Sequence, residues 1–281
     1  MTDKTVNIYF GRFHFHKPLD SFTSDNSILD QLKTFCEEPE IHTDTEDGDW
    51  KIGGVEVEDG VIYGKLGRIL TGEYEEPTWD EEEKDFVYED SEDTNFSYFA
   101  IIPSEKLIMY ERKKYIGHKQ FRTVFVEGFN NFYNSDDLLE INFIEQKGEF
   151  KEILSEASSI PEARFKQLEP TNPDFTEESK KIDNALRGMN AESAKLEAEN
   201  EEESLKFTDG SLLGSAIALV SEGYGEFSID YIMDGERKTL TSGDKPIRKE
   251  IVRPAVLEDF KHKVSSLKDF ISARMEENNE G

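Results

Sequence analysis

The chain has 281 residues, with 62 Asp and Glu against 33 Lys and Arg, and a formal net charge of −29. It has no apolar run approaching about 18 residues and no apolar signal stretch after its first residues, so we expect a cytoplasmic protein without a membrane partner. The single cysteine, Cys36, excludes an internal disulfide and a thiolate metal cluster within one chain.

The acidity has two readings. Like charges repel in dilute buffer and are screened by salt, so the composition favours a halophilic protein. Lysine outnumbers arginine, however, which salt-adapted proteins commonly avoid. The alternative is an acidic surface that mimics nucleic acid or binds a basic partner.

The first third of the chain predicts strands around one helix. The expected elements are a strand at 6–15, a helix that Asn26 or Ser27 caps and that runs through Cys36, and strands at 50–57 and 61–70. Asp59-Gly60 tolerates the positive φ of a tight turn and predicts a hairpin between the last two. Residues 71–93 hold twelve acids and one base, Lys84, so we expect a long acidic surface loop there.

The middle of the chain predicts a second hairpin and an amphipathic helix. The expected elements are strands at 96–102 and 106–110, a helix at 118–133, a strand at 138–144, a helix at 149–155 and a strand at 161–168. Apolar residues recur at helical spacing from Phe121 to Phe132, so this helix should pack on a sheet.

We divide the chain into an N-terminal α+β domain at 1–146 and a C-terminal one at 147–281. The latter should contain a polar helix or helical hairpin within 176–203, a helix at 211–220, a hairpin at 226–233 and 237–241 about Asp234-Gly235, and a terminal helix at 255–275. Antiparallel hairpins with single packed helices indicate the α+β class, because no regular β/α alternation occurs.

The sequence lacks the common catalytic signatures. It has no phosphate-binding loop and no Gly-x-Ser-x-Gly, and Gly223-Tyr224-Gly225 lacks the third glycine of a dinucleotide site. His14 and His16 share one face of a strand but are too few to hold a metal ion. We therefore predict no catalytic residue, no metal and no cofactor, and we favour a protein that is not an enzyme.

A metal-dependent nuclease or hydrolase is the alternative enzyme. Such sites combine an acid with Glu-x-Lys, because carboxylates hold the ion and lysine stabilises developing phosphate charge. The candidate sets are Asp137 with Glu145 and Lys147, and Asp230 with Glu236 and Lys238. In so acidic a chain, a solvated edge explains both sets as well.

Positive charge persists in two stretches, 112–122 and 237–263. As nucleic-acid or partner-binding residues we select Arg112, Lys113, Lys114, Lys119, Arg122, Arg237, Lys238, Lys245, Arg248, Lys249 and Arg253. Neutralisation by the acidic block at 71–93 is the competing interpretation. The binding hypothesis requires cations from both stretches to meet on one exposed surface.

The order of elements resembles the RexA phage-exclusion family and relatives from antiviral loci. The residues that carry the resemblance are Phe99-Ala100-Ile101-Ile102, the segment 164–173, and Gly223-Tyr224-Gly225 before the last hairpin. The resemblance implies a dimeric protein that binds DNA without strong sequence preference and acts in antiviral defence, with no catalytic residues to carry over. The net charge of −29 departs from the resemblance, because it is unfavourable for non-specific DNA binding.

The first hypothesis is therefore a non-enzymatic interaction or regulatory protein of an antiviral system. It would bind nucleic acid or a second protein through its basic residues, and the resemblance implies a homodimer. The nuclease and the acidic mimic remain as alternatives.

Overall fold

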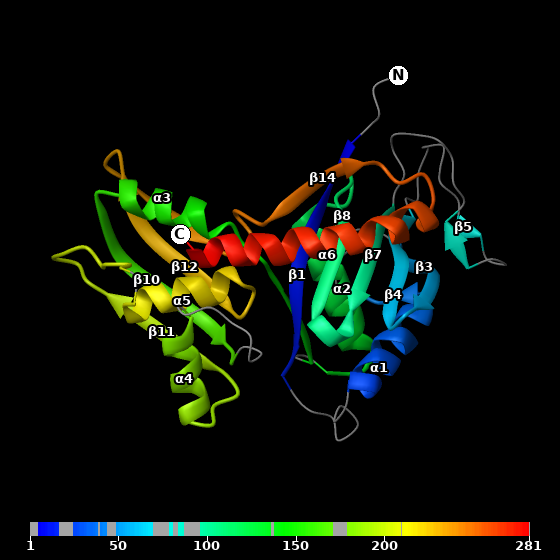
Figure 1. The fold of residues 1–281 in the computed structure, drawn as a ribbon, viewed down its shortest axis with the longest axis horizontal. Helices are drawn as coiled ribbons and strands as arrows, with labels where there is room; N and C mark the ends of the chain where they lie inside the picture. Colours follow the sequence, from blue (N-terminus) through cyan, green and yellow to red (C-terminus); the bar gives the residue numbers. More distant parts are fainter. Residues whose placement is uncertain are drawn as a thin grey trace. The chain divides into compact units, whose positions relative to one another are not determined.

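The computed structural model describes residues 5–16, 25–38, 40–43, 49–69, 79–80, 84–86, 96–135, 138–170, 179–208 and 210–280. The chain divides into two compact units. Unit 1 comprises Met1–Ile141 and Arg248–Lys268, and unit 2 comprises Asn142–Ile247 and Asp269–Gly281. Both units contain antiparallel sheets with helices, which confirms the predicted α+β class (Figure 1).

Unit 1 is built on an eight-stranded sheet with the order β14-β1-β8-β7-β4-β3-β2, and β9 also pairs with β1. The strands are β1 (Thr5–Phe15), β2 (Glu40–Ile41), β3 (Asp49–Glu58), β4 (Val61–Ile69), β7 (Phe96–Ile102), β8 (Leu107–Glu111), β9 (Leu139–Phe143) and β14 (Arg248–Val252). Both predicted hairpins are confirmed. Asp59 and Gly60 have φ of 50° and 78° between β3 and β4, and a 3-10 turn at Pro103–Glu105 joins β7 to β8.

The division into units differs from the predicted boundary after residue 146. The chain first passes from unit 1 to unit 2 after Ile141, which is close to the predicted boundary. The predicted C-terminal domain is nevertheless interrupted, because β14 pairs antiparallel with β1 from Thr5↔Val252 to Tyr9↔Arg248. Sequence reasoning misses β14 because three consecutive charged residues, 248–250, obscure the alternation that marks a strand.

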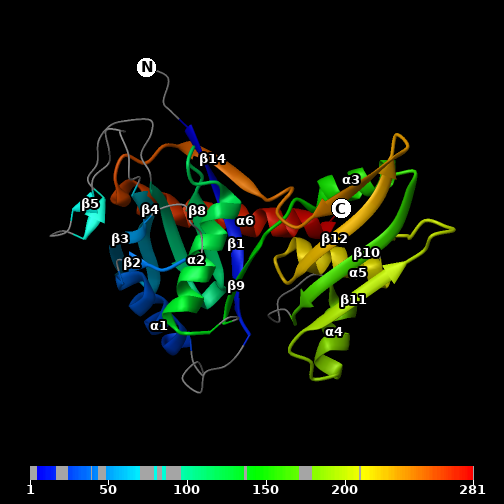
Figure 2. The same cartoon turned by 180° about the vertical axis from the view of Figure 1, so that it is seen from behind.

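Helices cover both faces of this sheet. Because adjacent strand residues point to opposite faces, Phe99 contacts Phe121 of α2 (His118–Phe132), with ring centroids 6.1 Å apart, whereas Tyr98 stacks at 5.7 Å on Phe260 of α6 (Leu257–Glu280). Figure 1 shows α6 in front of β1, β7 and β8, and Figure 2 shows α2 on the reverse side. The first helix, α1 (Asp25–Glu37), begins before Asn26 and Ser27, so neither residue precedes it as a cap.

The acidic stretch contains a short strand pair, β5 (Trp79–Asp80) with β6 (Asp85–Phe86). Phe86 is buried and stacks on Phe96 with centroids 5.5 Å apart, and the carboxylate of Asp85 lies 2.6 Å from Lys65 Nζ. The prediction of an acidic surface loop is therefore wrong for β6, because Lys65 neutralises the charge and the aromatic ring becomes buried. Residues 70–78, 81–83 and 87–95 lie outside the described part of the chain.

Replacing Gly67 by alanine should displace β6. A Cβ atom at Gly67 would lie 2.1 Å from Cζ of Phe86, so the ring must leave its site. Burial of an aromatic side chain contributes about 1.5–3 kcal/mol, and we expect a loss of about 2 kcal/mol in the free energy of unfolding of unit 1.

Urea denaturation followed by tryptophan fluorescence measures this loss, since Trp50 and Trp79 both belong to unit 1. Gly117→Ala is the control, because a Cβ atom there meets no atom within 4 Å. Equal stability of the two variants would contradict this role of Phe86.

Unit 2 has a four-stranded antiparallel sheet with the order β11-β10-β12-β13. Its elements are α3 (Lys147–Glu156), β10 (Ser159–Leu168), α4 (Lys180–Gly188), β11 (Ala194–Glu199), α5 (Leu212–Ser221), β12 (Glu226–Met233) and β13 (Glu236–Thr241). The predicted β12-β13 hairpin about Asp234-Gly235 is confirmed. Helices and sheet meet in one core, where Phe150 of α3 packs edge-on against Phe227 of β12 at 4.9 Å.

The prediction for residues 176–203 is half right. α4 is the expected polar helix, but the second part is the strand β11. Ala194, Leu196 and Ala198 are half-buried and alternate with exposed charged residues, while the backbone pairs with β10. The backbone pairing with β10 and the partial burial of every second side chain outweigh the helix propensity of Ala, Glu and Lys.

Candidate anion-binding surface

The edge strand β14 and the neighbouring strands β1 and β8 bring cations from distant parts of the chain to one face of the sheet. On β1, Tyr9 lies opposite Arg248 of β14 on one side and Tyr110 of β8 on the other. Arg112 N donates a hydrogen bond of 2.9 Å to Asn7 O, which extends the β1-β8 pairing by one row. Because strand side chains alternate, Arg112 shares the face of Tyr110, Tyr9 and Arg248. Two strand spacings of about 4.8 Å separate β14 from β8, so these arginines lie within reach of one ligand.

A tight turn follows β8 and holds two further exposed side chains. Lys113 N donates to Ile116 O at 3.1 Å, and the side chain of Ile116 is fully buried. The turn therefore exposes Lys114 and Tyr115, whose ring centroid lies 4.8 Å from Lys114 Nζ. Tyr115 is 40% exposed, which is unusual for an aromatic side chain held in a short turn. An exposed ring beside cations can stack on an unpaired base.

The first turn of α2 is fixed on the same face by stacked rings. The imidazole of His118 stacks on Tyr9 with centroids 4.8 Å apart and planes 3° apart. One turn later, Phe121 stacks on Tyr110 at 4.1 Å. The first turn holds no acid, and the helix N-terminus adds partial positive charge. We define the cationic face of unit 1 as Arg112, Lys114, Lys119, Arg122 and Arg248, together with the ring of Tyr115.

Among the described residues, Glu250 places a carboxylate on the same face as these cations. Glu250, two residues after Arg248, occupies the same face of β14 opposite Asn7 and accepts a hydrogen bond from Thr5 Oγ1. This contact occupies one of the two carboxylate oxygens of Glu250. The cationic face thus concentrates positive charge locally within a strongly acidic chain.

The opposite face of the sheet carries other cations from the segments that follow β8 and form β14. Lys113 Nζ lies 2.7 Å from the fully buried carboxylate of Glu111. Burial raises the pKa of Glu111, and the charge of Lys113 opposes this rise; burial also lowers the pKa of Lys113. Arg253 is close enough to act electrostatically on both groups. The selection of Lys113 as a binding residue is wrong, because its ammonium group is buried in this pair, and Lys249 lies on the face opposite Arg248.

The remaining predicted cations belong to unit 2 and form no part of the cationic face. Arg237 contacts Asp230 at 2.6 Å and Glu162 at 3.4 Å, and Lys245 lies 2.9 Å from Glu149. A hydrogen bond from Thr239, followed by the contact with Arg237, lowers the pKa of Asp230. Cations of the two basic stretches, 112–122 and 237–263, therefore share one face at Arg112 and Arg248. Arg237 and Lys245 are instead paired with acids of their own unit.

The nuclease alternative loses one of its residue sets. Asp230 lies opposite Thr239, whereas Lys238 lies opposite Tyr231, and Glu236 has the same parity as Lys238. Because side chains alternate across the sheet, Asp230 points away from the face of Glu236 and Lys238. The three groups cannot act on one metal ion.

The other acid set is also unsuited to metal binding. Glu145 is buried and accepts a hydrogen bond from the amide of Gly243, and Lys147 is buried as well. Asp137 lies outside the described residues. Within the described ranges, no group of three or more His, Cys, Asp or Glu side chains is placed to hold a metal ion.

His16 and the single cysteine have local surroundings that account for them. His16 Nε2 lies 2.5 Å from the carboxylate of Glu140. Cys36 is buried, and burial raises the pKa of its thiol, so the reactive thiolate form is disfavoured.

Sequence reasoning missed Tyr115 as part of the surface, and Tyr9 and His118 as the stacked rings that fix the first turn of α2. Tyr115 lies between Lys114 and the start of the predicted helix at 118–133. An aromatic residue in a basic turn can stack on a base, so Tyr115 could have been selected from the sequence. The stack of Tyr9 on His118 could not be predicted from the sequence, because it depends on pairing between strands far apart in the chain.

Residues 44–269 match a domain of unknown function, DUF4747. The chain belongs to the DUF4747 family. The DUF4747 match includes all five cations of the cationic face and leaves β1 outside. No curated protein matches the chain. Among the described residues of this DUF4747 protein, no helix combines the length and apolar character needed to cross a membrane.

Proposed function

We propose that the protein is a non-catalytic nucleic-acid-binding protein that holds a phosphate backbone on the cationic face of unit 1. The observation that supports this most is the register of β14, β1 and β8, which aligns Arg248 and Arg112 on one face. Guanidinium groups bind phosphate oxygens with two parallel hydrogen bonds. Lys114 and Lys119 add charge on the exposed turn and on the first turn of α2.

Single strands suit this surface better than duplexes. Tyr115 offers an exposed ring on which an unpaired base can stack, and such contacts contribute about 1–3 kcal/mol per base. A duplex keeps its bases stacked on each other and cannot use this contact. Recognition of a base edge is not needed, so we expect weak sequence preference.

The net charge of −29 sets the conditions for binding. At about 0.01 M salt the screening length is about 30 Å, so the acids of the whole chain repel a nucleic acid. Near 0.15 M it falls to about 8 Å, and only nearby groups act. Affinity should therefore change little between these conditions, and then fall at higher salt as phosphate contacts weaken.

The proposed cellular role is based on the order of the elements along the chain. We propose a cytoplasmic role in antiviral defence, with a homodimer as the binding form, because the order of elements resembles the RexA family. A protein partner with an acidic surface would be the alternative ligand for the same cations.

Fluorescence anisotropy with a labelled oligothymidylate tests the nucleic-acid proposal. Replacing Arg112, Lys119 and Arg248 together by alanine should weaken binding roughly tenfold or more, and reduce the salt slope above 0.15 M by about 2 for a single strand. Tyr115→Ala should weaken single-strand binding and leave duplex binding unchanged.

The matched control replaces Arg164, Lys166 and Lys195 of unit 2 by alanine, which removes the same number of exposed cations. This control should bind as the unmodified protein does. If both triple variants lose affinity equally, only overall charge matters and the proposed surface is wrong. If the unmodified protein binds neither single strands nor duplexes at any salt concentration, the nucleic-acid proposal is overturned.

A further inference from the structure

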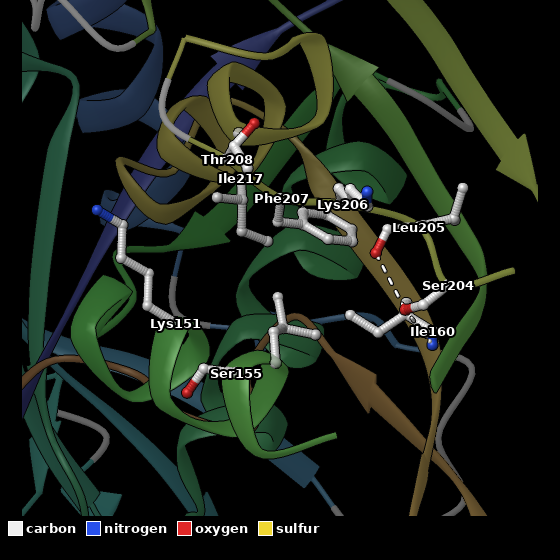
Figure 3. Close-up of a pocket in the computed structure, with 11 residues that line it drawn as sticks. Lys151, Ser155, Ile160, Ser204, Leu205, Lys206, Phe207, Thr208 and Ile217 are labelled. Atoms are coloured by element: carbon white, nitrogen blue, oxygen red, sulfur yellow. Dashed lines mark hydrogen bonds between the residues drawn. The ribbon is translucent and has the colours of Figure 1, made fainter. Parts of the chain in front are cut away.

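Unit 2 contains a cavity that the cationic face does not explain. It has a volume of about 680 Å³ and lies between α3, the start of β10, the segment 204–208 and the first turns of α5 (Figure 3). Cavities that bind small molecules commonly measure about 300–1,000 Å³. The cavity is therefore large enough for a ligand and not merely for a few water molecules.

Most of the cavity wall is apolar. Leu154, Ile160 and Ile217 belong to the buried core of unit 2, while Leu205 and Phe207 are half-buried along the segment 204–208. Figure 3 shows the Phe207 ring between Ile217 and Leu205. The apolar surface of these side chains favours a ligand with an apolar body.

Backbone contacts fix the shape of this wall. Ile160 N donates to Ser204 Oγ at 3.0 Å, and Leu205 N donates to Ile160 O at 2.9 Å. On the other side, a Cβ atom at Gly214 would lie 2.3 Å from Thr208 O, so only glycine allows this close approach of α5 to the segment. A wall held by backbone hydrogen bonds and close backbone packing forms the cavity before any ligand arrives.

The charge of the lining is opposite to that of the chain. Asp and Glu make up 62 of the 281 residues, yet none is among the described residues that line the cavity, which include Lys151 and Lys206. In Figure 3, Lys151 lies on one side of the cavity and Lys206 on the other. Ser204 and Thr208 add hydroxyl groups. Lysines on two sides of an apolar cavity are complementary to an anionic group on a small apolar molecule.

We propose that unit 2 binds a small amphipathic carboxylate in this cavity. The apolar body would lie against Leu154, Ile160 and Ile217, and the carboxylate would be held by Lys206, with Lys151 adding positive charge. This site is independent of the nucleic-acid surface, because the described residues that line it all belong to unit 2.

Calorimetric titration of the full chain with three probes of equal chain length tests the proposal. The probes are decanoate, decanol and decyltrimethylammonium, each kept below its micelle-forming concentration. We expect decanoate to bind about tenfold more tightly than decanol, as for one charge-assisted contact, and decyltrimethylammonium to bind weakest.

Two exposed lysines of unit 2 provide the matched variants. Lys206→Glu should remove the preference for decanoate over decanol, whereas Lys195→Glu on β11 should leave it unchanged. Phe207→Ala should weaken decanoate and decanol alike, because it removes part of the apolar wall. Equal binding of all three probes, equal effects of Lys206→Glu and Lys195→Glu, or no binding at all would each overturn the proposal.

Discussion

Lys113→Met should lower the free energy of unfolding of unit 1 by about 3–5 kcal/mol, as for the loss of one partner from a buried ion pair. The variant leaves the fully buried carboxylate of Glu111 without the ammonium group that lies 2.7 Å away. Methionine keeps much of the packing volume of lysine, so the loss reports the charge. Tryptophan fluorescence during urea denaturation measures it in unit 1.

The loss should depend on pH in a known direction. Burial already raises the pKa of Glu111 above its usual 4.5, and removing Lys113 raises it further. The folded variant then binds a proton more tightly than the unfolded chain does. Its stability relative to the unmodified protein is therefore best below pH 4.5 and declines as pH rises through the raised pKa. A loss of equal size at acidic and neutral pH would contradict this account.

Two further variants separate charge from position. Lys114→Met, at the exposed neighbouring position, should change the free energy of unfolding by no more than about 0.5 kcal/mol. Glu111→Leu combined with Lys113→Met should recover most of the stability, because an apolar pair often replaces a buried ion pair without loss. If Lys114→Met is as destabilising as Lys113→Met, the buried pair is not the cause.

The parts of the fold that depend on local chemistry were predictable. Asp59-Gly60 and Asp234-Gly235 adopt the positive φ expected of hairpin turns, and the apolar period from Phe121 to Phe132 marks α2. These signals need only neighbouring residues. β14 and β11 were missed because their stability comes from pairing with β1 and β10, which no local pattern shows.

The candidate surface was predictable in residue type and not in arrangement. Both basic stretches were visible, but alternation along β8 and β14 sends Arg112 and Arg248 to one face and Lys113 and Lys249 to the other. A strand register that is unknown from sequence thus decides which face each cation occupies, and it places Lys113 beside the buried carboxylate of Glu111. The cavity of unit 2 was unpredictable for the same reason, since it is formed by segments distant in sequence.

Phe121→Ala should destabilise unit 1 by about 3–5 kcal/mol and also weaken nucleic-acid binding. The ring is fully buried, stacks on Tyr110 at 4.1 Å and contacts Phe99 at 6.1 Å, so alanine leaves a cavity between α2 and the sheet. The same stack fixes the first turn of α2, which carries Lys119 of the cationic face. Loss of the stack therefore loosens the positioning of that charge.

Phe132→Ala is the matched control on the same helix. Phe132 is 36% exposed at the other end of α2, so its removal should cost clearly less stability and leave nucleic-acid binding unchanged. Binding is measured at a urea-free condition in which tryptophan fluorescence shows both variants to be folded. Loss of stability in Phe121→Ala with full retention of binding would show that the stack supports the core alone, and would separate the position of α2 from the binding of phosphate.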